Sequence, residues 1–186
     1  MMHFNLAKQL EESGRYDEAE TQYRRATDID PPYRKAFNNL ANLLLRRKDY
    51  DTALACYQRA ANAYPDDALI HYNMGTAYSM VGKQDESRTS FLRALRLNPN
   101  YEGAHHNLAS LYLAQGALDD AARHYREVLR INPESVPSLT MLAVALEQQG
   151  STNDVIPVYE QLLHLMPGDS SIGEKLRRAK GTFANE

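Results

Sequence analysis

The sequence predicts an all-α protein, a solenoid of five tandem helix-turn-helix units followed by a capping helix. Three observations predict this class: a period of 34 residues, an apolar stripe of helical spacing in each half of the period, and a proline at its end. The period is plainest in the recurring prolines, Pro31, Pro65, Pro99, Pro133 and Pro167. Because one helix pair cannot bury both of its stripes, neighbouring units are expected to stack.

The second unit illustrates the two helices that each period encodes. Its first helix has an apolar stripe made of Phe37, Leu40, Ala41 and Leu44, and its second a stripe made of Tyr50, Ala53, Leu54 and Tyr57. The small Ala41 and Ala53 predict a close approach of the two helices, and Tyr57 is expected to fill the wedge beside them. Proline disfavours the α conformation in the residue before it, so Tyr64–Pro65 ends the second helix.

One turn and one helix depart from the pattern. A glycine able to close the first helix in a left-handed conformation recurs between the helices, at Gly14, Gly82, Gly116 and Gly150. Lys48 takes this place in the second unit and predicts either another closure or mild strain. Pro157 lies inside the second helix of the fifth unit and predicts a bend or a late start, because it lacks a backbone donor. The acidic pairs at Asp66–Asp67 and Asp119–Asp120 are interpreted as favourable charges at helix starts.

Further slots repeat at the same period. One slot is Leu6, Leu40, Met74, Leu108 and Leu142, expected to face inward; a second is Tyr23, Tyr57, Phe91, Tyr125 and Tyr159. This pattern resembles the tetratricopeptide repeat family over residues 1 to about 169, and the resemblance implies a right-handed α-solenoid. We expect units at residues 1–33, 34–67, 68–101, 102–135 and 136–169, a capping helix at 170–181 and a frayed tail at 182–186. The solvated basic face of the last helix suits an end cap.

Composition excludes several classes of protein. With 43% hydrophobic residues, 24% charged residues and a net charge of -3, nothing favours nucleic-acid binding. No apolar run reaches the length that spans a bilayer, and no signal-peptide pattern opens the chain. The lone Cys56 leaves no internal disulfide. We expect a cytoplasmic protein, with the periplasm still open. Since the chain begins inside the first helix of its first unit, we hypothesise an excised fragment of a longer protein.

No pattern of catalytic residues is found in the sequence. It contains no phosphate-binding glycine loop, no His-Glu-x-x-His pair and no CxxC motif. The slot of His3, Phe37, His71, His105 and Leu139 is interpreted as packing, since one repeat step is too wide for histidines to share a metal. Cys56 is interpreted as a buried, inert thiol. We therefore expect no enzyme, no cofactor and no metal site.

One polar slot repeats without an evident packing role, and it predicts a binding surface. Asparagine precedes the inward Leu or Met in four units, at Asn5, Asn39, Asn73 and Asn107. Each amide offers donors and an acceptor, which suits the main chain of an extended peptide in a concave groove. Neighbouring candidates for the groove wall are Lys8, Lys35, Asn38, Asn42, Tyr72 and His106. The alternative is that each amide ties one unit to the next; both roles can coexist.

The asparagine slot also resembles the repeat superhelix of O-linked N-acetylglucosamine transferases, most clearly in the Ala-His-His-Asn-Leu-Ala run at residues 104–109. The resemblance implies that the amides hold substrate polypeptides, and it includes no transferase domain. The sequence therefore predicts a non-catalytic scaffold that binds a protein or an extended peptide. Two alternatives stay open: a substrate-targeting part of a larger enzyme such as a glycosyltransferase, and a self-assembly module that forms a homo-oligomer.

Overall fold

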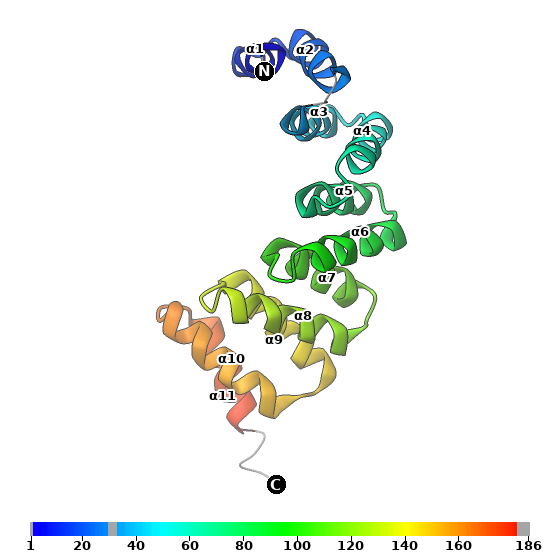
Figure 1. Cartoon of the computed structure of the whole chain (residues 1–186). Helices are drawn as coiled ribbons and strands as arrows, with labels where there is room; N and C mark the ends of the chain where they lie inside the picture. Colours follow the sequence, from blue (N-terminus) through cyan, green and yellow to red (C-terminus); the bar gives the residue numbers. More distant parts are fainter. Residues whose placement is uncertain (1, 30–32, 182–186) are drawn as a thin grey trace. The chain divides into compact units, whose positions relative to one another are not determined.

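The chain folds entirely into helices over the residues that its structure, a computed structural model, describes, which are 2–29 and 33–181 (Figure 1). These ranges hold eleven helices and no strand: α1 (Met2–Glu12), α2 (Tyr16–Asp28), α3 (Arg34–Arg46), α4 (Tyr50–Ala63), α5 (Ala68–Met80), α6 (Gln84–Leu97), α7 (Glu102–Ala114), α8 (Leu118–Ile131), α9 (Val136–Gln149), α10 (Thr152–Leu165) and α11 (Ser170–Gly181). The predicted all-α fold is confirmed. Pro31 and the expected frayed tail at 182–186 lie outside the described residues.

Consecutive helices pack as pairs within two compact units, Met1–Pro99 and Asn100–Glu186. In the first unit α1 packs on α2, α3 on α4 and α5 on α6, while α2–α3 and α4–α5 contacts join neighbouring pairs. In the second unit α7 packs on α8 and α9 on α10, and α8–α9 and α10–α11 contacts continue the series. Each of the two compact units thus buries the apolar stripes of its repeats between successive helices.

The predicted core slots are buried except at Leu6, which is exposed, and Met74, which is half-buried. Tyr23, Tyr57 and Tyr125 are fully buried, and so are Ala41 and Ala53, as the wedge and close approach require. The expectation that every member of the leucine slot faces inward is wrong for Leu6, which is 41% exposed. Leu40 is covered because α3 has neighbouring helices on both sides along the chain, whereas the described part of the chain places a neighbour only after α1.

Lys48 closes its turn in the left-handed conformation that glycine adopts in the other four turns. Its φ is +62°, against +72° to +75° for those glycines. The turn keeps the same hydrogen bonds, since the Asp49 N–H donates to the Leu44 carbonyl at 2.9 Å and the Lys48 N–H to the Leu45 carbonyl at 3.0 Å. Of the two sequence alternatives, another closure is wrong, and the positive φ of a non-glycine residue confirms the strain.

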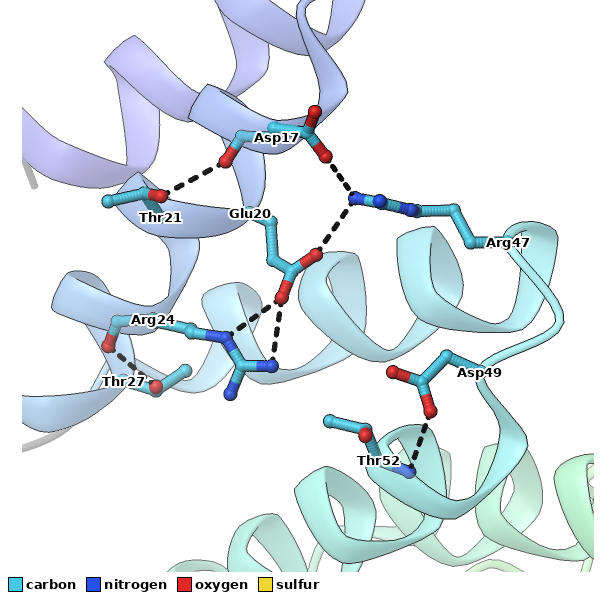
Figure 2. Close-up of polar contacts among 8 residues, drawn as sticks. All are labelled: Asp17, Glu20, Thr21, Arg24, Thr27, Arg47, Asp49 and Thr52. Atoms are coloured by element: carbon cyan, nitrogen blue, oxygen red, sulfur yellow. Dashed lines mark hydrogen bonds and ion pairs between the residues drawn. The ribbon is translucent and has the colours of Figure 1, made fainter.

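The residues on either side of Lys48 are held by side-chain contacts, shown in Figure 2. Arg47 lies between two carboxylates of α2, 2.8 Å from Asp17 and 3.0 Å from Glu20. Asp49 caps α4 by accepting a backbone N–H of its first turn. These contacts tie the turn to the preceding helix pair and to its own second helix, and so they hold the strained residue in place.

The remaining sequence expectations concern helix ends. The sequence predicts a bend or a late start for the helix that contains Pro157. The late start is wrong, because α10 begins at Thr152, one period after the start of α8, and continues through the proline. Asp67 caps α5 by accepting hydrogen bonds from the backbone N–H groups of Leu69 and Ile70 at 2.9 and 3.3 Å.

The helix expected to cap the chain forms as α11, and its apolar side chains are only half-buried. No helix within residues 2–29 and 33–181 has both the length and the hydropathy needed to cross a bilayer.

Candidate functional site

A groove of about 560 Å³ opens between α1 and α3 in the first compact unit. Six side chains line it: Lys8, Glu11, Glu12, Asn39, Asn42 and Arg46. Three of them are predicted groove residues, Lys8, Asn39 and Asn42. The other three were missed by sequence reasoning, although helical spacing could have found them, since each lies one or two turns beyond a predicted residue on the same face. The structure therefore brings part of the predicted wall together in one polar hollow.

Charges in this groove are partly neutralised within it. Arg46 forms an ion pair with Glu11 across the two helices. Glu11 also accepts a hydrogen bond from the hydroxyl of Tyr23 at 2.7 Å. Within the described ranges Lys8 and Glu12 form no ion pair, so one cation and one carboxylate remain available on the α1 wall.

The predicted asparagines of the first unit lie on successive first helices and bond across repeats. Asn39 donates from Nδ2 to the Tyr23 hydroxyl of α2 at 3.1 Å, and Asn73 donates from Nδ2 to Asn38 of α3 at 3.3 Å. Asn5 is exposed on α1, while Asn38, Asn39 and Asn73 are half-buried. Asn39 and Asn73 each use one donor, so their remaining donor and carbonyl oxygen are left for a ligand, whereas Asn38 uses its carbonyl oxygen as an acceptor. The contacts fit the unit-to-unit role and leave room for the binding role.

Asn42 lies one helical turn beyond Asn39 on the same face of α3. Its Oδ1 accepts a hydrogen bond from the buried Tyr57 hydroxyl at 2.9 Å. The equivalent residue of the fourth repeat, Ser110, contacts the hydroxyl of Tyr125 at the same distance of 2.9 Å. In both compact units a wedge tyrosine thus reaches a polar side chain on the first helix of its own repeat.

The other predicted wall residues of the first unit differ in exposure. Lys35 is exposed at the start of α3. Tyr72 is half-buried, with its ring 5.9 Å from that of Phe91 and tilted by 44°. Because it packs on a core residue, Tyr72 can offer a ligand only the remaining part of its ring.

Two predicted wall residues, His106 and Asn107, lie on α7 in the second compact unit, and both are half-buried. His106 Nδ1 is 2.9 Å from the Ser138 hydroxyl of α9, and its ring meets that of Tyr125 edge to face. Burial lowers the pKa of His106 below its usual value. The ring is engaged in a contact between repeats, and its burial favours the neutral form.

Buried polar side chains elsewhere serve packing. Cys56 is buried, as expected, its thiol donates to the Phe37 carbonyl, and burial raises its pKa to about 11, which disfavours the reactive thiolate. His105 and His124 form a buried contact, Nδ1 to Nδ1, of 2.9 Å. Burial, and then the neighbouring His105, lower the pKa of His124 to about 4. In the part of the chain that the structure describes, no three His, Cys, Asp or Glu side chains gather as metal ligands.

A second hollow, of about 320 Å³, lies in the second unit among α9, α10 and α11. At its edge the Tyr159 hydroxyl donates to Glu147, and Lys175 of α11 stands 3.3 Å from the same carboxylate. The ammonium of Lys175 is also 5.7 Å from the centre of the Tyr159 ring. This arrangement repeats the Glu11–Tyr23 contact of the first unit, four periods along the chain.

Comparison with known proteins gives one consistent family. Models described as tetratricopeptide repeat match residues 2–33, 33–100, 72–136 and 112–178. No curated protein matches the sequence at a significant level.

Several solved structures share the fold at low sequence identity. A crystal structure of MamA protein has a TM-score of 0.79 at 18% identity, covering 91% of this chain and 93% of that one. YrrB, described as a TPR protein with an unusual peptide-binding site, has a TM-score of 0.74 at 17% identity, covering 93% and 89%. A tetratricopeptide repeat protein from Parabacteroides merdae has a TM-score of 0.79 at 19% identity, covering 99% and 74%.

Proposed function

The chain belongs to the tetratricopeptide repeat family, and from this premise we propose that it is a non-catalytic scaffold that holds an extended peptide segment in its groove. The fold is that of a protein-interaction scaffold. All four family matches are to repeat models, and none is to a catalytic family. The observation that carries the finer proposal is the groove between α1 and α3, where Asn39, Asn42 and Lys8 line one hollow.

The groove binds main chain through amides. An extended peptide presents one N–H and one C=O per residue, and an asparagine side chain can pair with either group. Asn39 and Asn42 are three residues apart on α3, so their amides are neighbours on one face of the helix. Asn73 offers a further amide on α5. Lys8 adds a cation that favours an acidic side chain of the ligand beside the amides.

The proposal is tested with peptides selected from a random 12-residue phage library on the wild-type chain. Fluorescence anisotropy measures the affinity of a selected peptide for the wild type and for the double variant Asn39→Ala with Asn73→Ala. We expect at least a tenfold loss of affinity, because each lost hydrogen bond is worth about 1 kcal/mol. Asn62→Ala, on the exposed face of α4, is the matched control and should leave the affinity unchanged.

Thermal unfolding by circular dichroism separates binding from stability. If the double variant unfolds at a much lower temperature but binds the peptide normally when folded, the amides serve only to join repeats. Equal affinities of wild type and double variant at equal stability would also refute the proposal.

A further inference from the structure

Three side chains beside the groove form a hydrogen-bond chain whose direction is fixed. Glu11 is ion-paired with Arg46, so its carboxylate is ionised and can only accept hydrogen bonds. The Tyr23 hydroxyl has a single proton, which it donates to Glu11 at 2.7 Å. Toward Asn39 it can therefore only accept, and the group that faces it at 3.1 Å is the Nδ2 of Asn39.

This chain decides which end of the Asn39 amide faces the groove. A side-chain amide has its oxygen and its nitrogen on opposite sides, and either can in general point toward a partner. With Nδ2 held at Tyr23, turning the amide over would place Oδ1 against a hydroxyl that has no proton left to give. The Asn39 carbonyl is thereby not the group that faces Tyr23, and Asn39 is one of the residues that line the groove.

We propose that Glu11 and Tyr23 are positioning residues that fix the Asn39 carbonyl toward the groove, so that this position accepts a main-chain N–H of the bound peptide. This inference rests on the proposed peptide-binding function. It names a constraint on the ligand: the residue opposite Asn39 must carry a backbone N–H, which excludes proline there. An N-methylated residue is excluded for the same reason.

Neighbouring amides lack this constraint. The Tyr57 hydroxyl bonds to Asn42, and within the described part of the chain it makes no second hydrogen bond, so it can donate or accept as Asn42 turns. Asn73 and Asn38 are both amides and can turn over together while keeping their contact. Asn39 is therefore the amide of this wall whose polarity is set by the protein rather than by the ligand.

The Tyr–Glu hydrogen bond recurs four periods along the chain, in the second compact unit. There Tyr159 donates to Glu147, and the residue in the place of Asn39 is Lys175. Lys175 donates to the carboxylate of Glu147, whereas Asn39 donates to the hydroxyl of Tyr23.

A first experiment tests the orientation without any peptide. The probe is NMR of the side-chain NH₂ group of Asn39 in wild type, Tyr23→Phe and Glu11→Gln. We expect one Asn39 amide proton to exchange slowly with solvent in the wild type and both to exchange fast in either variant. Phe91 occupies the same slot in the third repeat, so a ring without the hydroxyl is compatible with the fold. Two fast-exchanging protons in the wild type would overturn the orientation.

A second experiment tests whether the bound peptide uses the oriented Asn39 carbonyl. A library-selected 12-residue peptide is N-methylated at one residue at a time, and each version is titrated against wild type, Tyr23→Phe, Glu11→Gln and the control Tyr125→Phe, whose hydroxyl contacts Ser110 instead of an amide. At one peptide position we expect a loss of about tenfold on the wild type and the control. That loss should be at least threefold smaller in Tyr23→Phe and Glu11→Gln, because the freed amide can turn.

The two proposals fail in distinguishable ways. Equal N-methylation losses in wild type and Tyr23→Phe overturn the positioning role while peptide binding stands. Peptides whose affinity ignores the Asn39→Ala with Asn73→Ala variant refute the proposed function. That result also refutes the claim that the peptide residue opposite Asn39 must carry a backbone N–H. The orientation of the Asn39 amide is then decided by the NMR exchange measurement alone.

Discussion

Replacing Lys48 by glycine should stabilise this protein, although the change removes a side chain. Lys48 closes the turn between α3 and α4 at a φ of +62°, where the other four turns have glycine. Its side chain is exposed, so the substitution uncovers no core. What changes is the cost of holding a residue with a Cβ in the left-handed region.

The magnitude follows from two opposing terms. A left-handed conformation costs an L-residue about 1–2 kcal/mol, which glycine avoids. Glycine in turn makes the unfolded chain more flexible, which costs about 0.5–1 kcal/mol on folding. The net gain is about 0.5–1 kcal/mol in the free energy of unfolding, or about 1–4 °C in Tm for a chain of this size.

Urea and thermal unfolding followed by circular dichroism at neutral pH measure this gain. Two glycine variants calibrate it: Gly82→Ala, at a φ of +75°, and Gly168→Ala, whose φ is not in the left-handed region; an added Cβ meets no atom within 4 Å at either position. Gly82→Ala should destabilise by about 1 kcal/mol, and Gly168→Ala should not. A Lys48→Gly variant no more stable than the wild type, beside a destabilised Gly82→Ala, would refute the strain argument.

Three further outcomes are expected. Leu108→Ala should lower the free energy of unfolding by about 2–5 kcal/mol in urea titrations, since Leu108 is fully buried; a loss under 1 kcal/mol would contradict this. Because the folded pKa of His124 is depressed to about 4, the wild type should lose stability as pH falls from about 6.5 toward 4, and His124→Gln should flatten that slope in melts across this range; parallel pH profiles would oppose the assignment. Gly75→Ala should destabilise by about 1–3 kcal/mol because its Cβ would lie 2.7 Å from the Phe91 ring, and a double-mutant cycle with Phe91→Leu should show coupling; additive effects would argue against the clash.

The fold could be predicted from the sequence because its signals are local and repeated. Helical spacing within each half of the period places the stripes, and a residue such as Pro65 ends a helix through its own covalent geometry. Leu6 shows the limit of this reasoning. It occupies the same slot as the buried Leu40, but burial depends on which helices lie beside the slot, and the slot itself does not encode that.

The candidate site was predicted in part. Asn39, Asn42 and Lys8 were found because the polar slot repeats at a fixed place on each first helix, and the structure gathers them in one groove. Glu11 and Arg46 were missed because the neighbouring repeats do not carry the same residue types in these slots. Their pairing joins side chains from different repeats, so the importance of each appears only when both helices are in place.

The sequence by itself determined the period, the order of the helices, the wedge tyrosines and the polar slot, since each follows from residue type and spacing along one helix. The tertiary structure alone decided that Tyr23 donates to Glu11 and accepts from Asn39, and that His105 meets His124 in the core. The physical reason is that a hydrogen bond has a direction and a length. Both depend on side chains that come from different helices, and packing brings those side chains within 3 Å or so of each other.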